Sequence, residues 1–351
     1  MADQVQQHDL TPIQSIANPR SYSVFDRAYK HTTDQLSRCR ECIDAYLQSH
    51  NLAEDDFCFV IVGSVGRYEA LEASDIDVIP VLRKEYRDFE QHDEAIRQRI
   101  GESLNVKVSR GADLTKFTTI QELTTGESIG GDTDGSAALT KRILILSESA
   151  QGGGRFPLDS VRREILNAYA GAERTSGRHV LSLCNDVARY YRTLCIEYKA
   201  KIDNRDKDWG TRNIKLRHSR KLWYLSTMLG IASLLQDGAT GEDNYRLRIL
   251  ELFELPPYLR LVQAVKNGEV QCIEGTRRIL DSFAWFLDFM SRPENRRALA
   301  DVKHSDRYEA LVGNPFPAMK FNSDLMHREM ISLLDSLGRP MRTRVLDWFL
   351  L

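Results

Sequence analysis

FCFVIVGSVGRYEALEASDIDVIPV, residues 57–81, is the stretch of this chain that decides its fold. It opens with an apolar run, FCFVIV at 57–62, and a second run, IDVIPVL, follows at 76–82. Both runs have the length and the β-branched and aromatic composition of buried strands. Gly63 and Ser64 end the first run, where small residues let a substrate approach the backbone. The stretch predicts two strands joined through a glycine-containing turn whose N–H groups suit a phosphate.

Two carboxylates stand at the start of the second strand. Asp75 and Asp77 flank Ile76. Because side chains alternate along a strand, we expect both aspartates on one face and Ile76 in the core. Like charges held side by side raise each other's pKa unless a cation lies between them, and a hard divalent ion with oxygen ligands suits that place. The pair therefore predicts Mg²⁺ or Mn²⁺, with Asp75 and Asp77 as metal ligands.

The segments around this stretch predict a domain with a sheet and flanking helices. Apolar residues recur at helical spacing from about 24 to 50, and a charged amphipathic helix is expected at about 85–103. NVKVSR at 105–110 is predicted as a third strand. GESIGGDTDG at 126–135 and QGGG at 151–154 are expected to be flexible loops enclosing a short apolar run.

Strand-like runs disappear in the second half of the chain, and helical patterns continue to its end. The clearest helix is expected at 187–198, and a second one at about 211–235. Further helices are expected near 244–254, 258–267, 273–290 and 324–336. The predicted fold class is α+β, with a small mixed sheet flanked by helices and then an all-helical domain. The predicted division is a flexible arm at 1–20, a catalytic domain at 21–155 and a helical domain for substrate or acceptor at 156–351.

Composition excludes several protein classes. The chain has 351 residues, of which 42% are hydrophobic and 28% charged, so collagen-like and wholly disordered chains are excluded. A formal net charge of −2 gives no bulk polycation for nucleic acid. No signal peptide or membrane span is expected, because the N-terminus MADQVQQHDL is polar and no apolar run approaches membrane length. The six cysteines are expected as free thiols, which fits a reducing cytoplasm.

Cys39 and Cys42 form a CxxC motif, the pattern that raises the question of zinc or redox chemistry. No second Cys pair or Cys/His pair follows at zinc spacing. The surrounding segment, QLSRCRECIDAYL, is predicted to be helical. We therefore interpret these two cysteines as free thiols without a zinc or redox function.

Residues 63–81 resemble the signature of the polymerase β-like nucleotidyltransferase superfamily, which is an apolar strand, GS, a spacer and DhD, where h is apolar. Gly66, Arg67, Glu69 and Ser74 make it most similar to the GSxGRxE…SDID form of signal-transducing uridylyl- and adenylyltransferases. The resemblance is strict over the two predicted strands and looser to about residue 150.

The resemblance implies a reaction in which NMP moves from an NTP such as ATP to a hydroxyl group and pyrophosphate is released. Gly63 and Ser64 would hold the β and γ phosphates, and Asp75 and Asp77 would bind the metal ions. Two metal ions stabilise an in-line displacement because they neutralise charge on the attacking and leaving oxygens.

The family also supplies a third acidic residue from a later strand. Asp113 follows the predicted strand NVKVSR and is our choice as third catalytic carboxylate and metal ligand. Asp132 and Asp134 in the loop GGDTDG are competitors. The alternative for Asp113 is a helix N-cap, because an aspartate before LTKF can accept backbone N–H bonds.

Two other residues near these motifs have a structural alternative. Arg67 either counters phosphate charge or pairs with Glu69 or Glu72, and the sequence leaves both interpretations open. His218 is expected to be structural rather than catalytic.

Charge is unevenly distributed along the chain. Residues 189–221 hold eleven Lys or Arg against four Asp or Glu, whereas residues 51–94 hold twelve acids against four bases. At helical spacing, Arg212, Lys215 and Ser219 share one face. Such a face can clamp the triphosphate of an NTP or the phosphates of an RNA, and a solvated helix face is the alternative. We predict these three residues as nucleotide contacts.

The acceptor is the open question at this stage. A macromolecular hydroxyl is expected, and the form of the motif favours a protein acceptor and hence regulatory nucleotidylation. The basic segment keeps tRNA or another RNA open, including a toxin-like activity. A small-molecule or second-messenger product is also compatible with the motif, as is an inactive regulator that binds nucleotide. The expected partners are an NTP, a protein or RNA acceptor and an additional partner protein, with no membrane.

Overall fold

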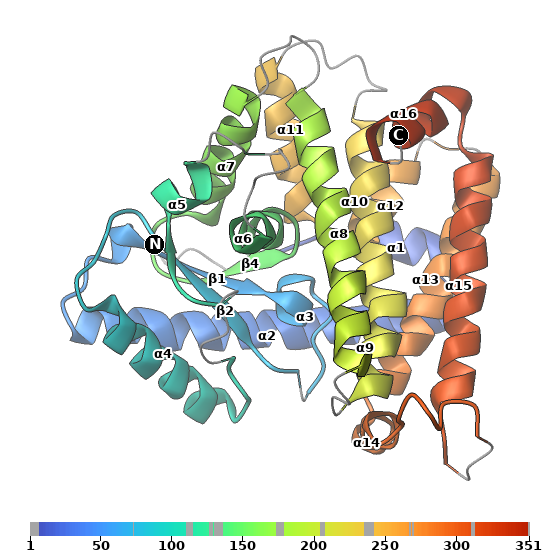
Figure 1. The fold of residues 1–351 in the computed structure, drawn as a ribbon, viewed down its shortest axis with the longest axis horizontal. Helices are drawn as coiled ribbons and strands as arrows, with labels where there is room; N and C mark the ends of the chain where they lie inside the picture. The colour runs from blue at the N-terminus through green and yellow to red at the C-terminus, as the bar shows by residue number, and fades with distance from the viewer. Residues whose placement is uncertain are drawn as a thin grey trace. The chain divides into compact units, whose positions relative to one another are not determined.

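The computed structural model describes residues 7–72, 74–109, 115–125, 129, 136–172, 179–203, 208–234, 242–266, 268, 270–309 and 313–349. These residues form two compact units, each built from separate pieces of the chain (Figure 1). The first unit takes its described residues from Met1–His8, Ala28–Asp186 and Thr240–Pro256. The second takes them from Asp9–Arg27, Val187–Ala239 and Pro257–Leu351. The predicted domain boundary at 155/156 lies inside the first unit, and the division by function stays a prediction.

A four-stranded mixed sheet forms the centre of the first unit. Its strand order is β3-β2-β1-β4, with β1 at Phe57–Val62, β2 at Asp77–Leu82, β3 at Thr118–Thr119 and β4 at Ser149–Gly153. β1 pairs antiparallel with β2 and β4, and β2 pairs parallel with β3. Every residue of β1 is buried, because this central strand is covered on both faces. The predicted α+β class with a small mixed sheet is confirmed.

Helices cover this sheet on both sides. Figure 1 shows the sheet between α2 (Pro19–Ser49) and α6 (Ser136–Ser147). Leu36, Cys39 and Ile43 are fully buried and recur at the spacing of one helix face, which explains why this segment is helical. The other helices of the unit are η1 (Glu54–Asp56), α3 (Gly63–Gly66), α4 (Phe89–Leu104), α5 (Ile120–Thr124), α7 (Leu158–Ala172) and α11 (Glu242–Glu254), with the first residues of α8 (His179–Asp203).

The glycine-rich segment 151–154, predicted as a flexible loop, is mostly strand β4, so that prediction is wrong. A Cβ atom on Gly153 would lie 2.7 Å from Cβ of Ile43 on α2. A Cβ atom on Gly152 would overlap the side chain of Ile61 on β1. The glycines therefore let the backbone approach its neighbours closely, which is a packing role and not a sign of flexibility.

Two other assignments near the sheet differ from expectation. The predicted third strand at 105–110 contributes an isolated parallel bridge, Val108 with Ile76, and the edge strand is β3 instead. The same alternation of apolar residues occurs in a single bridge and in a full strand. The sequence therefore does not show how many residues pair, which depends on the tertiary structure. The apolar run RILILS belongs to helix α6, because a short apolar run alone does not distinguish a buried helix from a strand.

Within the described residues of the second unit, all regular secondary structure is helical. Its helices are α1 (Thr11–Ile16), the remainder of α8, α9 (Trp209–Lys215), the π-helical turn η2 (Leu216–Arg220), α10 (Lys221–Ser233), α12 (Pro257–Val265), α13 (Val270–Met290), α14 (Pro293–Ala300), α15 (Phe316–Ser336) and α16 (Arg339–Phe349). The helical C-terminal part is thus confirmed. The predicted helix at 211–235 is divided by η2.

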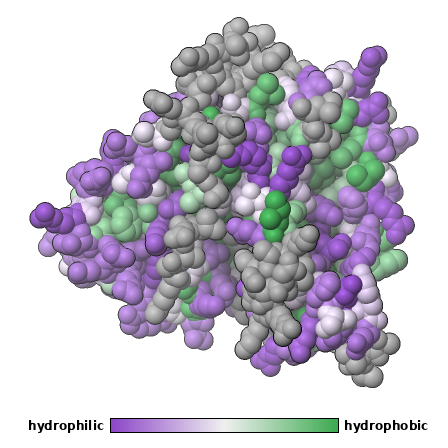
Figure 2. All heavy atoms as spheres, in the orientation of Figure 1, coloured by the Kyte–Doolittle hydropathy of each residue, from purple (hydrophilic) through white to green (hydrophobic). Residues whose placement is uncertain are grey.

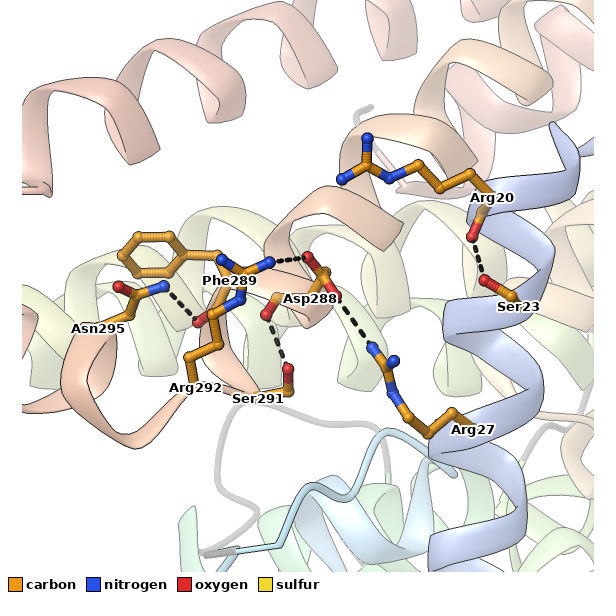
Figure 3. Close-up of polar contacts among 8 residues, drawn as sticks. All are labelled: Arg20, Ser23, Arg27, Asp288, Phe289, Ser291, Arg292 and Asn295. Atoms are coloured by element: carbon orange, nitrogen blue, oxygen red, sulfur yellow. Dashed lines mark hydrogen bonds and ion pairs between the residues drawn. The ribbon is translucent and has the colours of Figure 1, made fainter.

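The start of α2 belongs to this second unit. Phe25 is fully buried, and its ring centroid lies 5.0 Å from that of Tyr258 on α12. Asp288 on α13 accepts hydrogen bonds from Nη2 of Arg27 at 3.0 Å and from Nη2 of Arg292 at 2.9 Å (Figure 3). The same helix therefore contributes core residues to both units.

The predicted flexible arm at 1–20 is wrong for its described residues. Residues 11–16 form α1, and Ile13 in this helix is fully buried. Pro12 occupies the first turn of α1, a position where proline fits because the N–H it lacks has no helical partner. Pro12 therefore lies in a packed helix and not in a flexible arm.

Hydrophilic side chains dominate the described surface in the view of Figure 2, and hydrophobic ones form separate patches. Among the helices that the structure describes, none combines the length and the hydropathy needed to cross a bilayer.

Candidate functional site

Gly63 lies where β1 ends, directly beside Asp77. Val62 of β1 pairs with Asp77, the first residue of β2. Gly63, the next residue along the chain, therefore lies beside the start of β2. Gly63 has φ +76°, in the left-handed region that glycine adopts without strain. A Cβ atom there would lie 2.9 Å from Oδ2 of Asp77. Both backbone conformation and space therefore require glycine at this position.

The predicted glycine turn is the one-turn helix α3, with half-buried Ser64 as its second residue. The first N–H groups of a helix have no partner within it, so they are available to an anion. Gly66 closes the turn, and a Cβ atom on it would lie 2.7 Å from the carbonyl oxygen of Ile61. The two glycines hold a tight backbone corner against β1.

The aspartate pair has the alternation that the sequence predicts around Ile76. This isoleucine is fully buried, whereas Asp75 is exposed and Asp77 is half-buried. The backbone of Ile76 donates to the carbonyl of Lys107 at 2.9 Å and accepts from the N–H of Ser109 at 3.0 Å. The neighbouring segment thus fixes the backbone between the two carboxylates.

Ser109 and Arg97 support Asp77, and sequence reasoning missed both residues. Ser109 Oγ donates to Oδ1 of Asp77. Arg97 on α4 is buried, and its Nη1 donates to the carbonyl of Ser109 at 2.9 Å. Its Nη2 donates to the carbonyls of Val78 at 3.1 Å and Thr115 at 2.7 Å. A single buried guanidinium therefore joins three segments around the aspartate, a role that no local pattern indicates.

Arg67 pairs with carboxylates, which is the second of its two predicted interpretations. Its side chain is 5% exposed, and its Nε donates to Oε2 of Glu69 at 3.0 Å. Its Nη1 also donates to the fully buried Glu148, which precedes β4. Burial lowers the pKa of Arg67, but the charges of Glu69 and Glu148 outweigh this effect and raise the pKa above its ordinary value. Arg67 therefore anchors α3 to β4 and is not placed as a phosphate contact.

The donor set around Gly63 fits a hard divalent cation. Asp77 is held at Oδ1 by Ser109, and a Cβ atom on Gly63 would lie only 2.9 Å from its Oδ2. Carboxylate oxygens are the ligands that Mg²⁺ and Mn²⁺ prefer. Asp75 and Asp77 stay the predicted metal ligands.

The third carboxylate stays a prediction. Asp113, Asp132 and Asp134 lie outside the described residues. Within the described ranges, no cluster of three His, Cys, Asp or Glu side chains has metal-binding geometry.

Cys39 and Cys42 lie within α2, as the sequence predicts for this CxxC segment. Cys39 is fully buried, and burial raises the pKa of its thiol to about 12. A thiol of that pKa is inert near neutral pH because the thiolate is the reactive form. None of the six cysteines forms a disulfide.

The three predicted nucleotide contacts of the basic segment do not share an exposed face. Arg212 is half-buried and Lys215 is exposed, both on α9, whereas Ser219 is buried within η2. A π-helical turn takes more residues than an α-helical turn and so rotates later side chains around the axis. Ser219 therefore does not share an exposed face with Arg212 and Lys215, and nucleotide contact stays a prediction for all three residues.

His218 is structural, as expected. It is fully buried, its ring stacks on Phe286 at 4.6 Å, and its Nδ1 lies 2.9 Å from the carbonyl of Ile214. The amide of Asn322 lies 3.1 Å from its Nε2. Burial lowers the pKa of His218 to about 4.

The comparisons with known proteins concern the N-terminal part of the chain. Residues 13–107 match a family model described as "Putative nucleotidyltransferase DUF294". The matched range contains β1, the Gly63–Ser64 corner, both aspartates and β2. It supports a nucleotidyltransferase family and nucleotidyl transfer as the general activity, with an NTP as substrate. No curated protein matches the chain.

Proposed function

We propose that this protein is a metal-dependent nucleotidyltransferase that moves NMP from an NTP, such as ATP, to a hydroxyl group of a protein. One observation carries the proposal: the left-handed Gly63 is packed against Oδ2 of Asp77, which brings the backbone corner and a carboxylate together. The family match over the same residues supports it.

Each residue of the corner has a separate task. Gly63 and Ser64 present backbone N–H groups and a hydroxyl to the β and γ phosphates, which fixes the triphosphate relative to the aspartates. Asp75 and Asp77 hold Mg²⁺ or Mn²⁺, which supplies positive charge for the phosphate oxygens and the acceptor oxygen. Ser109 keeps one oxygen of Asp77 occupied, so the other stays directed toward Gly63. Asp113 is proposed as the third carboxylate.

The acceptor and the location belong to the same proposal. The GSxGRxE…SDID form supports a protein acceptor, because the enzymes it resembles act as regulators. The six free cysteines support a reducing compartment, for which the cytoplasm is our proposal.

The test is transfer of label from each of the four α-³²P-labelled NTPs, with Mg²⁺ or Mn²⁺, to protein and RNA fractions of a cell lysate. Asp75→Asn and Asp77→Asn keep the side-chain shape but remove the charge that a metal ion needs. Asp88→Asn is the matched control, because Asp88 is exposed and its left-handed backbone suits asparagine.

We expect metal-dependent label in the protein fraction for wild type and Asp88→Asn, and none for Asp75→Asn or Asp77→Asn. Label in the RNA fraction instead would show that the acceptor is an RNA and not a protein. Label that persists in both site variants would refute the assignment of the aspartates. Metal-dependent NTP binding without transfer to either fraction would favour a small-molecule acceptor or an inactive regulator.

A further inference from the structure

Basic side chains from two parts of the helical unit converge on one carboxylate. Arg217 on η2 lies with Nη1 3.6 Å from Oδ1 of Asp324 on α15. Lys320, one turn earlier on α15, lies with Nζ 2.6 Å from Oδ2 of the same aspartate. Lys221 follows Arg217 by one turn, and His327 follows Asp324 by about one turn. We call Arg217, Lys221, Lys320 and His327 the α15 cation cluster.

The charges in this cluster do not balance. Arg217 and Lys320 share Asp324, and within the described residues no carboxylate forms an ion pair with Lys221. Burial lowers the pKa of Lys221, Arg217 lowers it further, and Asp324 opposes both effects. Partial burial lowers the pKa of His327, and Lys221 and Arg217 add to this effect. Burial is the largest cause of both shifts, and the neighbouring cations add to it.

Uncharged side chains of α8 lie next to the α15 cation cluster. Tyr191 hydrogen-bonds Cys195, and the charge of Lys221 acts on the Cys195 thiol. The ring of Tyr191 stacks on Tyr224 of α10, with centroids 4.3 Å apart and planes within 5°. These side chains add rings and weak hydrogen-bonding groups but no negative charge, so the excess positive charge stays uncompensated.

We propose that the α15 cation cluster binds an oligophosphate, such as the triphosphate chain of a nucleotide. Arg217 and Lys221 are about 6 Å apart along their helix, and Lys320 and His327 are about 10 Å apart along α15. This spread matches several adjacent phosphoryl groups. Arg217, Lys221 and Lys320 are half-buried and His327 is exposed, and Arg217 and Lys320 share one carboxylate. Such an arrangement suits a compact polyanion better than an RNA backbone with one charge per nucleotide.

This site uses none of the residues assigned to nucleotidyl transfer, so its test needs no metal and no reaction. Inorganic tripolyphosphate is titrated into the full chain in EDTA at low salt by isothermal titration calorimetry. Lys221→Met removes the charge and keeps most of the length, and Lys221→Arg keeps the charge. Lys303→Met is the matched control, because Lys303 is an exposed lysine of the same unit outside the cluster.

We expect binding by wild type, Lys221→Arg and Lys303→Met, and at least about tenfold weaker binding by Lys221→Met, because a hydrogen bond to a charged group contributes that much. Thermal stability of Lys221→Met should equal or exceed that of wild type, since an unbalanced ammonium is removed. A second readout is the pKa of His327 measured by NMR titration, with its signal assigned by comparison with His327→Gln. This pKa should rise when tripolyphosphate binds.

Three results would overturn the proposal: no binding by wild type, equal binding by Lys221→Met and Lys303→Met, or an unchanged titration of His327. If the first of these results comes with Lys221-dependent binding of a short single-stranded RNA, the cluster is assigned to RNA. Failure here leaves the transfer activity untouched, because that activity is tested through Asp75 and Asp77.

Discussion

Replacing Arg67 by methionine tests whether this residue anchors the fold or contacts phosphate. The substitution leaves Glu69 and Glu148 buried without their cation, and Glu148 is fully buried. Breaking a buried ion pair by removing one partner costs about 3–5 kcal/mol. For a unit of this size, each kcal/mol lowers the unfolding midpoint by about 2–4 °C, so we expect a loss of about 6–20 °C.

The matched control is Arg155→Met. Arg155 also pairs with a glutamate, Glu54, at 2.7 Å, but its side chain is 65% exposed. Exposed pairs contribute about 0–1 kcal/mol, so this control should unfold within a few degrees of wild type. The two variants remove the same charge and differ in burial, which isolates the cost of leaving buried carboxylates unpaired.

The assays are urea unfolding followed by circular dichroism, thermal unfolding, and NTP binding. The raised pKa of Arg67 keeps its guanidinium charged throughout neutral pH. Its stabilising effect should therefore be constant there and be lost as the pH rises into strong alkali. A stability of Arg67→Met within about 1 kcal/mol of wild type, with NTP binding lost, would refute the anchoring role and restore the phosphate interpretation.

Three further predictions concern other positions. Gly66→Ala places a Cβ atom on the carbonyl oxygen of Glu148 and should cost about 1–3 kcal/mol in urea unfolding, and an unchanged midpoint would contradict the tight corner. Burial lowers the pKa of His218 to about 4, so the folded protein binds fewer protons than the unfolded one between pH 6.5 and 4. Wild type should therefore lose about 3 kcal/mol as the pH falls through this window, a slope that His218→Leu should lack. Ser109→Ala should weaken Mn²⁺ binding several-fold in electron paramagnetic resonance titrations whereas Ser109→Thr should not, and equal affinities would show that Asp77 needs no such support.

Local sequence pattern was sufficient for the elements that carry the aspartates. The apolar runs predicted β1 and β2, and the helical spacing of buried residues such as Leu36 and Ile43 predicted α2. The burial of Ile76 between Asp75 and Asp77 followed from strand alternation. These features depend on neighbours in the chain, so the sequence contains the information directly.

Tertiary structure decided features that have no local signal. The glycines of β4 pack against Ile43 and Ile61, whereas the sequence alone suggested a flexible loop. The π-helical turn buries Ser219 and places Arg217 beside Asp324, so the shared face expected for Arg212, Lys215 and Ser219 does not exist. One inserted residue in a helix changes which side chains share a face, and the sequence pattern does not reveal it.

Arg67 shows the physical reason most directly. Its pairing with Glu69 could be proposed from the sequence, because the two residues are close in the chain. Its second partner, Glu148, is 81 residues away and reaches Arg67 because β4 lies beside β1 in the sheet. The same holds for Arg97, which reaches Ser109, Thr115 and Val78 from α4. Periodicity records which side chains of one element share a face, but the partner of a buried charge is chosen by the packing of distant segments.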